Sequence, residues 1–488
     1  MTGHFPPGED PAGYDPLGRR SLPAAWAARW AAAPDAEVLF EAGRGWLTAG
    51  ALEEATRRVA GRFAGVGLVA GDRVLFSTAT SVELVVAHVA AYRAGLVVVP
   101  ANTAYTEREI AHVARDARVR AAVVDDVERA RWVRDAGGAD VVVTGPDVDL
   151  ADAPPPPLDG VGPDDPAHLG YTSGTTGAPK GAALTHGNLL ANSEALERAW
   201  RWTAEDRLVL ALPLFHAHGL CNGLHGTLLA GASAVLLPGF TVDSVLDAAA
   251  EHDATLFFGV PTMYHRLAAS ARALELGRLR LCVSGSAALP AELHRSLQDG
   301  AGVAVLERYG MTETNMLVSN PYDGERRAGT VGLPLPGVEV RLADGGEIEV
   351  RGPNVFGGYW QRPEATVEAF TDDAWFRTGD LGDHDDAGYL RLLGRAKELI
   401  ITGGYNVYPR EVEDVLGAHP DVTEAAVVGI PSTEWGETVV AYVVGGGDTA
   451  AVQSWAESQL AAYKRPREYR WVTTLPRNAL GKVQKHLL

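Results

Sequence analysis

Short apolar runs of strand length alternate along the chain with longer segments of helix length. Strand-like runs lie at residues 73–77, 97–100 and 121–125, and helix-like segments lie at 51–66 and 107–117. Repeated alternation of strands and helices favours parallel sheets that are covered by helices. The pattern therefore predicts an α/β fold for most of the chain.

The pattern changes from about residue 395 onward. The expected elements there are a helix, two strands and a second helix, over residues 410–416, 425–429, 439–444 and 451–462. Such a short mixture of helices and strands indicates a small α+β unit. We therefore expect a large N-terminal multi-subdomain α/β domain over residues 1–394 and a small α+β C-terminal domain over residues 395–488. A run of four prolines at 154–157 fits either a domain linker or a surface loop.

Composition narrows the function classes. The 488 residues include 43 Lys plus Arg against 62 Asp plus Glu, a formal net charge of -19. This excess of negative charge argues against broad binding of nucleic acid or anionic lipid. The two cysteines, Cys221 and Cys282, are too far apart for a CxxC pattern, which excludes a disulfide framework and fits a reducing compartment.

No targeting or membrane segment is expected. The N-terminus lacks the basic start and apolar run of a secretory signal, and the most apolar window, 82–101, contains Glu83, His88 and Arg93. These features predict a cytoplasmic protein that works on small molecules, with neither a membrane nor a nucleic-acid partner. The sequence leaves the oligomeric state open.

Residues 171–181 form the sharpest local motif, Tyr-Thr-Ser-Gly-Thr-Thr-Gly-Ala-Pro-Lys-Gly. Backbone N–H groups and hydroxyls in such a loop wrap phosphate oxygens, while an ammonium neutralises them. It is not a Walker A loop, because Pro179 precedes the lysine and Gly181 follows it. A strand is expected next, with Thr185 as the N-cap of a helix. The candidate phosphate ligands are Thr172, Ser173, Gly174, Thr175, Thr176, Gly177 and Lys180. A plain Ser/Thr/Gly turn is the alternative.

Other motifs favour no competing chemistry. The glycines of 65–71 are spaced wrongly for a dinucleotide fingerprint and predict a turn. His216 and His218 are expected on one face of a strand, where they serve packing or substrate contact, since no third metal ligand accompanies them. The G-x-S-x-G and H-E-x-x-H signatures are absent from the sequence, so serine hydrolase and zinc protease readings lose their support.

Seven further motifs follow in order along the chain, at residues 212–216, 283–286, 307–313, 376–380, 394–397, 403–407 and 476–482. Together with the phosphate loop, they resemble the adenylate-forming superfamily of acyl-CoA synthetases, luciferases and nonribosomal adenylation domains. The resemblance runs from about residue 51 to the C-terminus. Within the superfamily, residues 258–266, 307–315 and 401–409 are most similar to malonyl-CoA synthetases. The resemblance implies ATP, Mg²⁺ and coenzyme A as cofactors or substrates, and a C-terminal domain that moves.

The residue chemistry fits this resemblance. Attack of a carboxylate on the α-phosphate of ATP joins two anions, so the site needs positive charge and magnesium. Glu313, beside Thr312, is the expected magnesium ligand, with a surface glutamate as the alternative. Asp380, expected in an exposed turn, would accept bonds from the ribose hydroxyls, and Arg395 would clamp ribose or phosphate unless it is a solvated charge. Tyr309 offers a face for adenine or packs in the core.

The resemblance also implies roles for residues elsewhere in the chain. Lys482 is expected to bridge the acyl carboxylate and the α-phosphate, and Lys397 is expected at the hinge of the moving domain. Gly403 and Gly404 would line the pantetheine channel, where glycine permits close backbone approach. The resemblance adds Ser286, Ala287, Glu307 and Arg308 to the ATP site, and Thr312 and His216 to the catalytic group. Lys464 and Arg465 are candidates for the CoA 3′-phosphate site, or form a solvated helix end.

Two cations that a general acyl-CoA synthetase does not need predict which acid the enzyme activates. Arg308 and Arg266 would each grip a second carboxylate, with His216 and Ser286 lining the same small pocket. Malonate, or methylmalonate, is therefore the expected acid, converted with ATP and CoA to its thioester, AMP and diphosphate. In the alternative, Arg308 pairs with Glu307 or another acidic side chain, and Arg266 caps a helix.

Three other functions stay open from the sequence. The enzyme could be a CoA ligase for another small acid, or a stand-alone adenylation domain that loads a carrier protein, because both acceptors present the same thiol. It could also be a non-catalytic ligand-binding homologue. The joint presence of Lys180, Glu313, Asp380 and Lys482 argues against this last reading.

Overall fold

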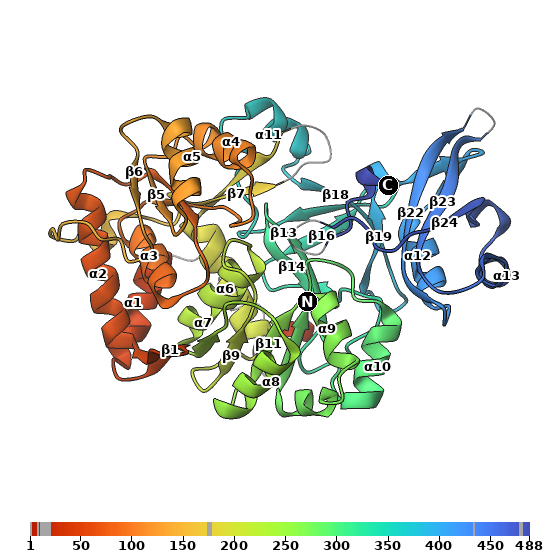
Figure 1. Ribbon diagram of the computed structural model, residues 1–488, viewed down its shortest axis with the longest axis horizontal. Coiled ribbons are helices and arrows are strands. Elements are labelled where there is room, and N and C mark those ends of the chain that lie inside the picture. The colour runs from red at the N-terminus through yellow and green to blue at the C-terminus, as the bar shows by residue number, and fades with distance from the viewer. Residues whose placement is uncertain (1, 7–8, 10–20, 173–177, 433–434, 478–481) are drawn as a thin grey trace.

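The computed structural model describes residues 2–6, 9, 21–172, 178–432, 435–477 and 482–488 of the chain. Figure 1 shows sheets and covering helices from residue 21 to about residue 395 at the left and centre, and a smaller unit at the right. The order of elements follows the predicted alternation, and the predicted large α/β domain with a small α+β C-terminal domain is confirmed. The boundary at residues 394 and 395 and the mobility of the smaller unit stay predictions.

The first sheet is parallel except for its last pair of strands. Its spatial order is β6 (Val142–Thr144), β5 (Ala121–Val124), β3 (Arg73–Ser77), β4 (Val97–Pro100), β7 (Pro166–Thr172) and β8 (Lys180–Thr185). β7 and β8 run antiparallel, with Thr172 opposite Lys180. Thr172 and Lys180, which flank the central residues of the phosphate-loop motif, therefore lie side by side in a hairpin at the edge of the sheet. Thr185 caps the following helix as predicted, by accepting a bond from Asn188 N.

The second sheet carries three of the seven other motifs, residues 212–216, 283–286 and 307–313, at or just after the ends of its strands. Its order is β15 (Leu333–Pro334), β14 (Asn315–Ser319), β13 (Leu306–Met311), β12 (Leu281–Ser284), β11 (Leu256–Gly259), β9 (Arg207–Leu210), β10 (Ser233–Leu236), β1 (Glu37–Glu41) and β2 (Gly45–Thr48). Strands from β1 to β13 in this order pair in parallel, and the flanking pairs are antiparallel. Ligands of such sheets bind at the carboxyl ends of parallel strands.

The helices that cover these two sheets hold much of the apolar core. They are α1 (Leu22–Ala32), α2 (Ala49–Gly65), α3 (Val82–Arg93), α4 (Glu107–Asp116), α5 (Val127–Gly137), α6 (His186–Ala199), α7 (His225–Ala230), α8 (Val242–Glu251), α9 (Pro261–Ala268) and α10 (Ala291–Ala301).

No described helix is both long and apolar enough to cross a membrane.

Two smaller sheets complete the fold. The antiparallel third sheet contains β16 (Glu339–Leu342), β17 (Glu347–Arg351), β18 (Phe376–His384) and β19 (Leu390–Arg395), with α11 (Pro363–Ala369) beside it. The C-terminal sheet contains β21 (Tyr405–Val407), β20 (Ile400–Thr402), β23 (Gly436–Gly445), β22 (Val422–Ser432) and β24 (Glu468–Trp471), with α12 (Pro409–Gly417) and α13 (Thr449–Gln459). The C-terminal unit has its own apolar core, which includes Ile400, Val412 and Val439.

One prediction about local structure is wrong. His216 and His218 were expected on a strand, but His216 lies in a bend and His218 begins a π-helix, His218–Leu224. Single π-helical turns often occur at functional sites. The two imidazoles are therefore presented by an irregular segment after β9, and not by a sheet face.

Four histidines lie buried together between the first sheet and helices α3, α6 and α7. His88, His168, His186 and His225 are each at most 2% exposed. Burial lowers the pKa of His88 to about 3 and those of His168 and His186 to about 4, and the pKa of His225 lies well below its usual value for the same reason. These imidazoles are thus neutral in the folded protein.

This cluster predicts a loss of stability in mild acid. The folded-state pKa values lie below the 6.5 of a free imidazole, so stability is fully present above pH 6.5 and falls as the pH drops toward 4. Each histidine contributes a loss of about 2 kcal/mol by pH 5. Chemical denaturation at pH 7.5 and pH 5 measures it. His88→Met should flatten this dependence and the exposed His486→Met should not; equal slopes in both variants would contradict the assignment.

Candidate active site

The hairpin that carries the phosphate-loop motif is anchored on both sides to α4. The Tyr171 hydroxyl donates to Asp116 Oδ2 at 2.8 Å, and His112 Nε2 lies 2.9 Å from Pro179 O. Thr172 and Lys180 begin the two shoulders of the loop. The predicted ligands Ser173, Gly174, Thr175, Thr176 and Gly177 lie outside the described residues. The two anchored shoulders fix where the loop leaves and rejoins the sheet.

Glu313, the predicted magnesium residue, lies in the turn between β13 and β14 and is buried. The Tyr359 hydroxyl donates to its Oε1 at 3.0 Å, and burial raises the pKa of Glu313. Lys180 Nζ lies 5.3 Å from the centroid of the same Tyr359 ring. Thr312 packs against Gly170 of β7, where a Cβ would overlap the Thr312 methyl group. The structure thus brings the lysine and the glutamate of two distant motifs to one tyrosine.

Asp380 was expected in an exposed turn, and this expectation is wrong. It lies within β18, is 7% exposed, and faces Arg395 across the hairpin. Arg395 Nε is 2.7 Å from Asp380 Oδ1, and the Tyr309 hydroxyl donates to Asp380 Oδ2 at 2.5 Å. Burial raises the pKa of Asp380, although Arg395 and Tyr309 act in the other direction. Each carboxylate oxygen keeps lone pairs with which it could accept a bond from a ligand.

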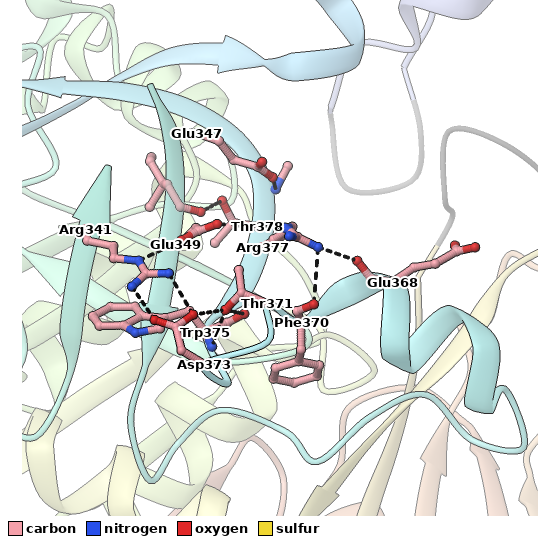
Figure 2. A network of polar contacts seen from close by, with 12 residues as sticks. Arg341, Glu347, Glu349, Glu368, Phe370, Thr371, Asp373, Trp375, Arg377 and Thr378 are labelled. Carbon is pink, nitrogen blue, oxygen red and sulfur yellow. Dashed lines mark hydrogen bonds and ion pairs between the residues drawn. The ribbon is translucent and has the colours of Figure 1, made fainter. Parts of the chain in front are cut away.

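A network of polar contacts that includes Thr378 and Glu347 links β17 to β18, the strand that carries Asp380, as Figure 2 shows for the residues it labels. Thr378 Oγ1 donates to Ile348 O at 2.7 Å and accepts from Asp380 N at 3.1 Å. Glu347 Oε1 accepts from the N–H of Gly379 at 3.2 Å, and Gly379 has φ +70°, a conformation that favours glycine. These bonds hold the register of β17 and β18 at the point where Asp380 must lie.

Lys482, the predicted catalytic lysine, lies in the C-terminal segment near Asp380. Burial of its amino group lowers its pKa, and Asp380 and Glu398 act on that pKa in the opposite direction. The segment is held near its end by Lys485, whose Nζ lies 2.7 Å from Glu413 Oε1 and 3.3 Å from Glu398 Oε2. Lys482 is thus close enough to Asp380 and Glu398 for their charges to act on it, and its catalytic role stays a prediction.

Arg308 is a buried cation with unmatched donors. It is 4% exposed, and its Nε and one terminal guanidinium nitrogen are buried without a hydrogen-bond partner in the described residues. The guanidinium lies against Gly285, where a Cβ would overlap its central carbon. Burial lowers the pKa of Arg308 to about 9. A buried guanidinium in this state is poised to receive an anion.

Glu307 does not accept hydrogen bonds from the unmatched donors of Arg308. Its Oε1 accepts from Leu289 N at 2.8 Å, and its Oε2 is buried without a partner, so the expected alternative of an Arg308–Glu307 hydrogen bond is not what the structure shows. Burial raises the pKa of Glu307 to about 7. Ala287, another residue predicted for the ATP site, is exposed in the loop between β12 and α10.

Two histidines lie near the charge of Arg308, and Ser286 lies beside one of them. Burial, followed by the charge of Arg308, lowers the pKa of His216 to about 4 and that of His218 well below its usual value. The Ser286 hydroxyl lies 3.4 Å from His218 Nδ1, and Ser286 has φ +69°. His218 was not among the predicted acid-binding residues, although its proximity to His216 was visible in the sequence. These side chains form a small buried polar cluster with one fixed cation.

Arg266 is not among the buried side chains of this cluster. It lies exposed in the last turn of α9, while Tyr264 on the same helix is buried and donates to Val283 O at 3.0 Å. The predicted pair of acid-gripping arginines is therefore wrong for this conformation. The reason is helical geometry, because residues two apart face different sides of a helix.

The remaining predicted residues belong to the C-terminal unit. Lys397 is exposed in the short turn between β19 and β20. Gly403 and Gly404 form the exposed β20–β21 turn, with φ +58° and +82°. Lys464 Nζ is 2.6 Å from Glu411 Oε1, and Arg465 Nε donates to Leu460 O at 2.8 Å. These two cations already have protein partners in this conformation.

The donor chemistry fits Mg²⁺ better than a metal held by protein ligands alone. Within the described part of the chain, no group of three or more His, Cys, Asp or Glu side chains could hold a metal ion. Mg²⁺ commonly takes one or two carboxylates together with substrate phosphates. Glu313, a buried carboxylate with one oxygen bound by Tyr359, fits that requirement.

Comparison with known proteins identifies the class. The AMP-binding enzyme family matches residues 26–360, and the AMP-binding enzyme C-terminal domain matches residues 411–482. The chain belongs to this family of AMP-binding enzymes. The predicted membership of the adenylate-forming superfamily and the predicted activity of an AMP-forming acyl-CoA synthetase are confirmed. ATP and CoA are the substrates of such ligases.

Individual relatives differ in the acid that their names state. A mitochondrial malonate–CoA ligase of Mus musculus is 38% identical over 479 residues, which cover 86% of this chain and 82% of the relative. A sulfoacetate–CoA ligase of Cupriavidus necator is 38% identical over 507 residues and covers 98% of each chain. ATP-bound MatB from Rhodopseudomonas palustris has a TM-score of 0.89 and 43% identity, over 96% of this chain and 98% of that chain.

Proposed function

We propose that the protein is an ATP-dependent malonyl-CoA synthetase, with methylmalonate as a second possible acid. The observation that carries the proposal is Arg308, a buried guanidinium with unmatched donors beside His216, His218 and Ser286. A long-chain or aryl tail would leave this cation unpaired at considerable cost, whereas a second carboxylate binds it. Similarity to the malonate–CoA ligase supports the same acid.

One other small acid has specific support. Sulfoacetate, the acid in the name of the Cupriavidus necator relative, also carries a second anionic group, so Arg308 would accept it for the same reason. The geometry thus favours small acids with two negative charges. It gives no such preference for a fatty acid.

In the first half-reaction, a carboxylate oxygen of the acid attacks the α-phosphorus of ATP, and the bond to diphosphate breaks. Lys180 and the phosphate loop neutralise the polyphosphate, while Asp380 accepts from the ribose hydroxyls and Arg395 holds Asp380 in place. Ser286, Ala287, Glu307 and Tyr309 complete the nucleotide pocket. Lys482 bridges the acyl carboxylate and the α-phosphate as charge develops. Glu313, beside Thr312, would hold Mg²⁺, which supplies positive charge to the phosphates.

In the second half-reaction, the CoA thiolate attacks the acyl carbonyl carbon and AMP leaves. The C-terminal unit rotates at Lys397, withdraws Lys482 and brings Gly403 and Gly404 to the pantetheine arm. Lys464 and Arg465 would then bind the CoA 3′-phosphate, which requires Lys464 to exchange its contact with Glu411 for the phosphate.

Release of AMP with different acids and acceptors tests this function. With ATP, Mg²⁺ and free CoA, we expect malonate to give the highest kcat/KM among malonate, methylmalonate, sulfoacetate, propionate and octanoate. Replacing CoA by a phosphopantetheinyl carrier protein should lower the rate. Preference for octanoate would refute the proposal that the substrate is a small acid with two negative charges. Preference for the carrier protein would identify an adenylation domain.

Arg308 should determine the preference for a second carboxylate. Arg308→Ala leaves that carboxylate unpaired at a buried position, which costs about 3 to 5 kcal/mol, or roughly 10² to 5 × 10³ in kcat/KM for malonate. Propionate activity should stay low and unharmed. Gly285→Ala should act in the same direction because its Cβ displaces the guanidinium. The exposed Arg266→Ala is the matched control, and a loss there equal to that of Arg308→Ala would count against this pocket.

Lys482 should be needed for only one half-reaction. We expect Lys482→Ala to abolish acid-dependent diphosphate release, because nothing else bridges the carboxylate and the α-phosphate. Thioester formation from CoA and pre-made acyl-adenylate should survive. The two rates are measured separately on the same preparation. If both fall by the same factor, Lys482 has a structural role instead.

A further inference from the structure

The loop between β17 and α11 crosses two motifs that are far apart in the sequence. We call residues 353–360 of this loop the strap. At its first half, Phe356 N donates to Glu313 O at 2.9 Å, and Asn354 Nδ2 donates to Thr314 O at 2.7 Å and to Met316 O at 2.9 Å. Asn354 is 2% exposed, so these bonds are shielded from water. The first half of the strap therefore fixes the backbone around the magnesium residue.

The second half of the strap is fixed to the strand that begins at Lys180. Ala183 N donates to Gly358 O at 3.2 Å, and Trp360 N donates to Gly181 O at 2.8 Å. Between these bonds, Tyr359 lies opposite Ala182 in an antiparallel bridge. The strap thus adds one short stretch to the β7–β8 hairpin. Its second half is fixed relative to β8, the strand that follows the phosphate loop.

Tyr359, in the second half of the strap, connects the two motifs that the strap crosses. Its backbone N–H donates to Thr366 Oγ1 at 2.9 Å, which fixes the residue from the α11 side. Its hydroxyl donates to Glu313 Oε1 at 3.0 Å, and its ring lies 5.3 Å from Lys180 Nζ. One side chain therefore contacts both the lysine of the phosphate loop and the carboxylate of the magnesium turn.

We propose that Tyr359 is a positioning residue for the polyphosphate of ATP, with a separate task for each part of its side chain. The hydroxyl occupies one oxygen of Glu313 and turns the other oxygen toward Mg²⁺ and the phosphates. The ring face holds the Lys180 ammonium by a cation–π contact, so that the ammonium reaches the same phosphates. The proposal rests on the phosphate and magnesium roles proposed above for Lys180 and Glu313, and it does not depend on which acid the enzyme activates.

Two substitutions separate the two tasks. Tyr359→Phe keeps the ring and removes the hydroxyl, whereas Tyr359→Leu removes both. Tyr389→Phe is the matched control, because Tyr389 is also largely buried and its hydroxyl donates a single bond, to Glu325 O at 3.1 Å, away from the site. Thermal denaturation of all variants shows whether each one folds.

The measurement is the calorimetric affinity for ATP without any acid substrate, so no turnover occurs. It is made once with Mg²⁺ and once with EDTA. For Tyr359→Phe we expect roughly tenfold weaker binding with Mg²⁺ and unchanged binding in EDTA, because only the carboxylate loses its donor. For Tyr359→Leu we expect the same loss with Mg²⁺ and a further loss of about threefold to tenfold in both conditions, because Lys180 loses the ring. Tyr389→Phe should match the wild type in both.

Several results would overturn the proposal. Tyr359→Phe could bind ATP like the wild type in both conditions, or lose equal affinity in both. Tyr359→Leu could also behave like Tyr359→Phe in EDTA. Failure of the proposed malonate specificity looks different, because the wild type would then bind ATP normally in the calorimeter and release no AMP with malonate.

Discussion

The ion pair between Asp380 and Arg395 connects the parts of the site that come from different sheets. Both residues lie on the last hairpin of the third sheet, and Arg395 ends the strand that leads to the C-terminal unit. Tyr309 reaches the same carboxylate from the second sheet, and Lys482 acts on it from the C-terminal segment. A buried carboxylate without a cation would be protonated or would destabilise the fold. The pair therefore favours the charged form of Asp380 where several elements meet.

Buried charge also explains why the supporting contacts are so extensive. Thr378 and Glu347 hold the backbone of Asp380, Tyr359 holds Glu313, and Asp116 holds the shoulder of the phosphate loop through Tyr171. None of these side chains needs to touch the reacting atoms. Catalytic groups must be held to within a fraction of an ångström by neighbours whose own positions are fixed. The site is thus built from a few charged groups and a larger set of neutral partners.

The sequence predicted the parts of this arrangement that depend on local pattern. The alternation of apolar runs predicted β3, β4, β5, α2 and α4, and the N-cap at Thr185 follows from its own side chain. Burial set by tertiary contacts was not predictable in this way. Asp380 was expected in an exposed turn because Gly379 precedes it, yet pairing with β17 and β19 buries it.

Other residues were missed because their signal is long-range. Tyr359 follows two glycines in what the sequence alone presents as an ordinary loop, and its partner Glu313 is 46 positions away. Arg266 looked equivalent to Arg308 because both are cations near predicted motifs. Only the helical position of Arg266 and the strand position of Arg308 place one in solvent and the other in the interior. Ordered motifs identified the family, while the contacts among them required the fold.

In the proposed function, the state of Arg308 before any substrate binds already determines which acid the enzyme prefers. Its unmatched donors cost stability in the free protein, since a buried guanidinium has lost its water without gaining a partner. An acid with a second anionic group restores those bonds, and an acid with an apolar tail leaves the cost in place. Discrimination in the proposed reaction therefore comes from a penalty against the wrong acid as much as from attraction to the right one. The neutral state of His216 and His218 fits this division, because it leaves the charge in the pocket to one residue that the substrate must match.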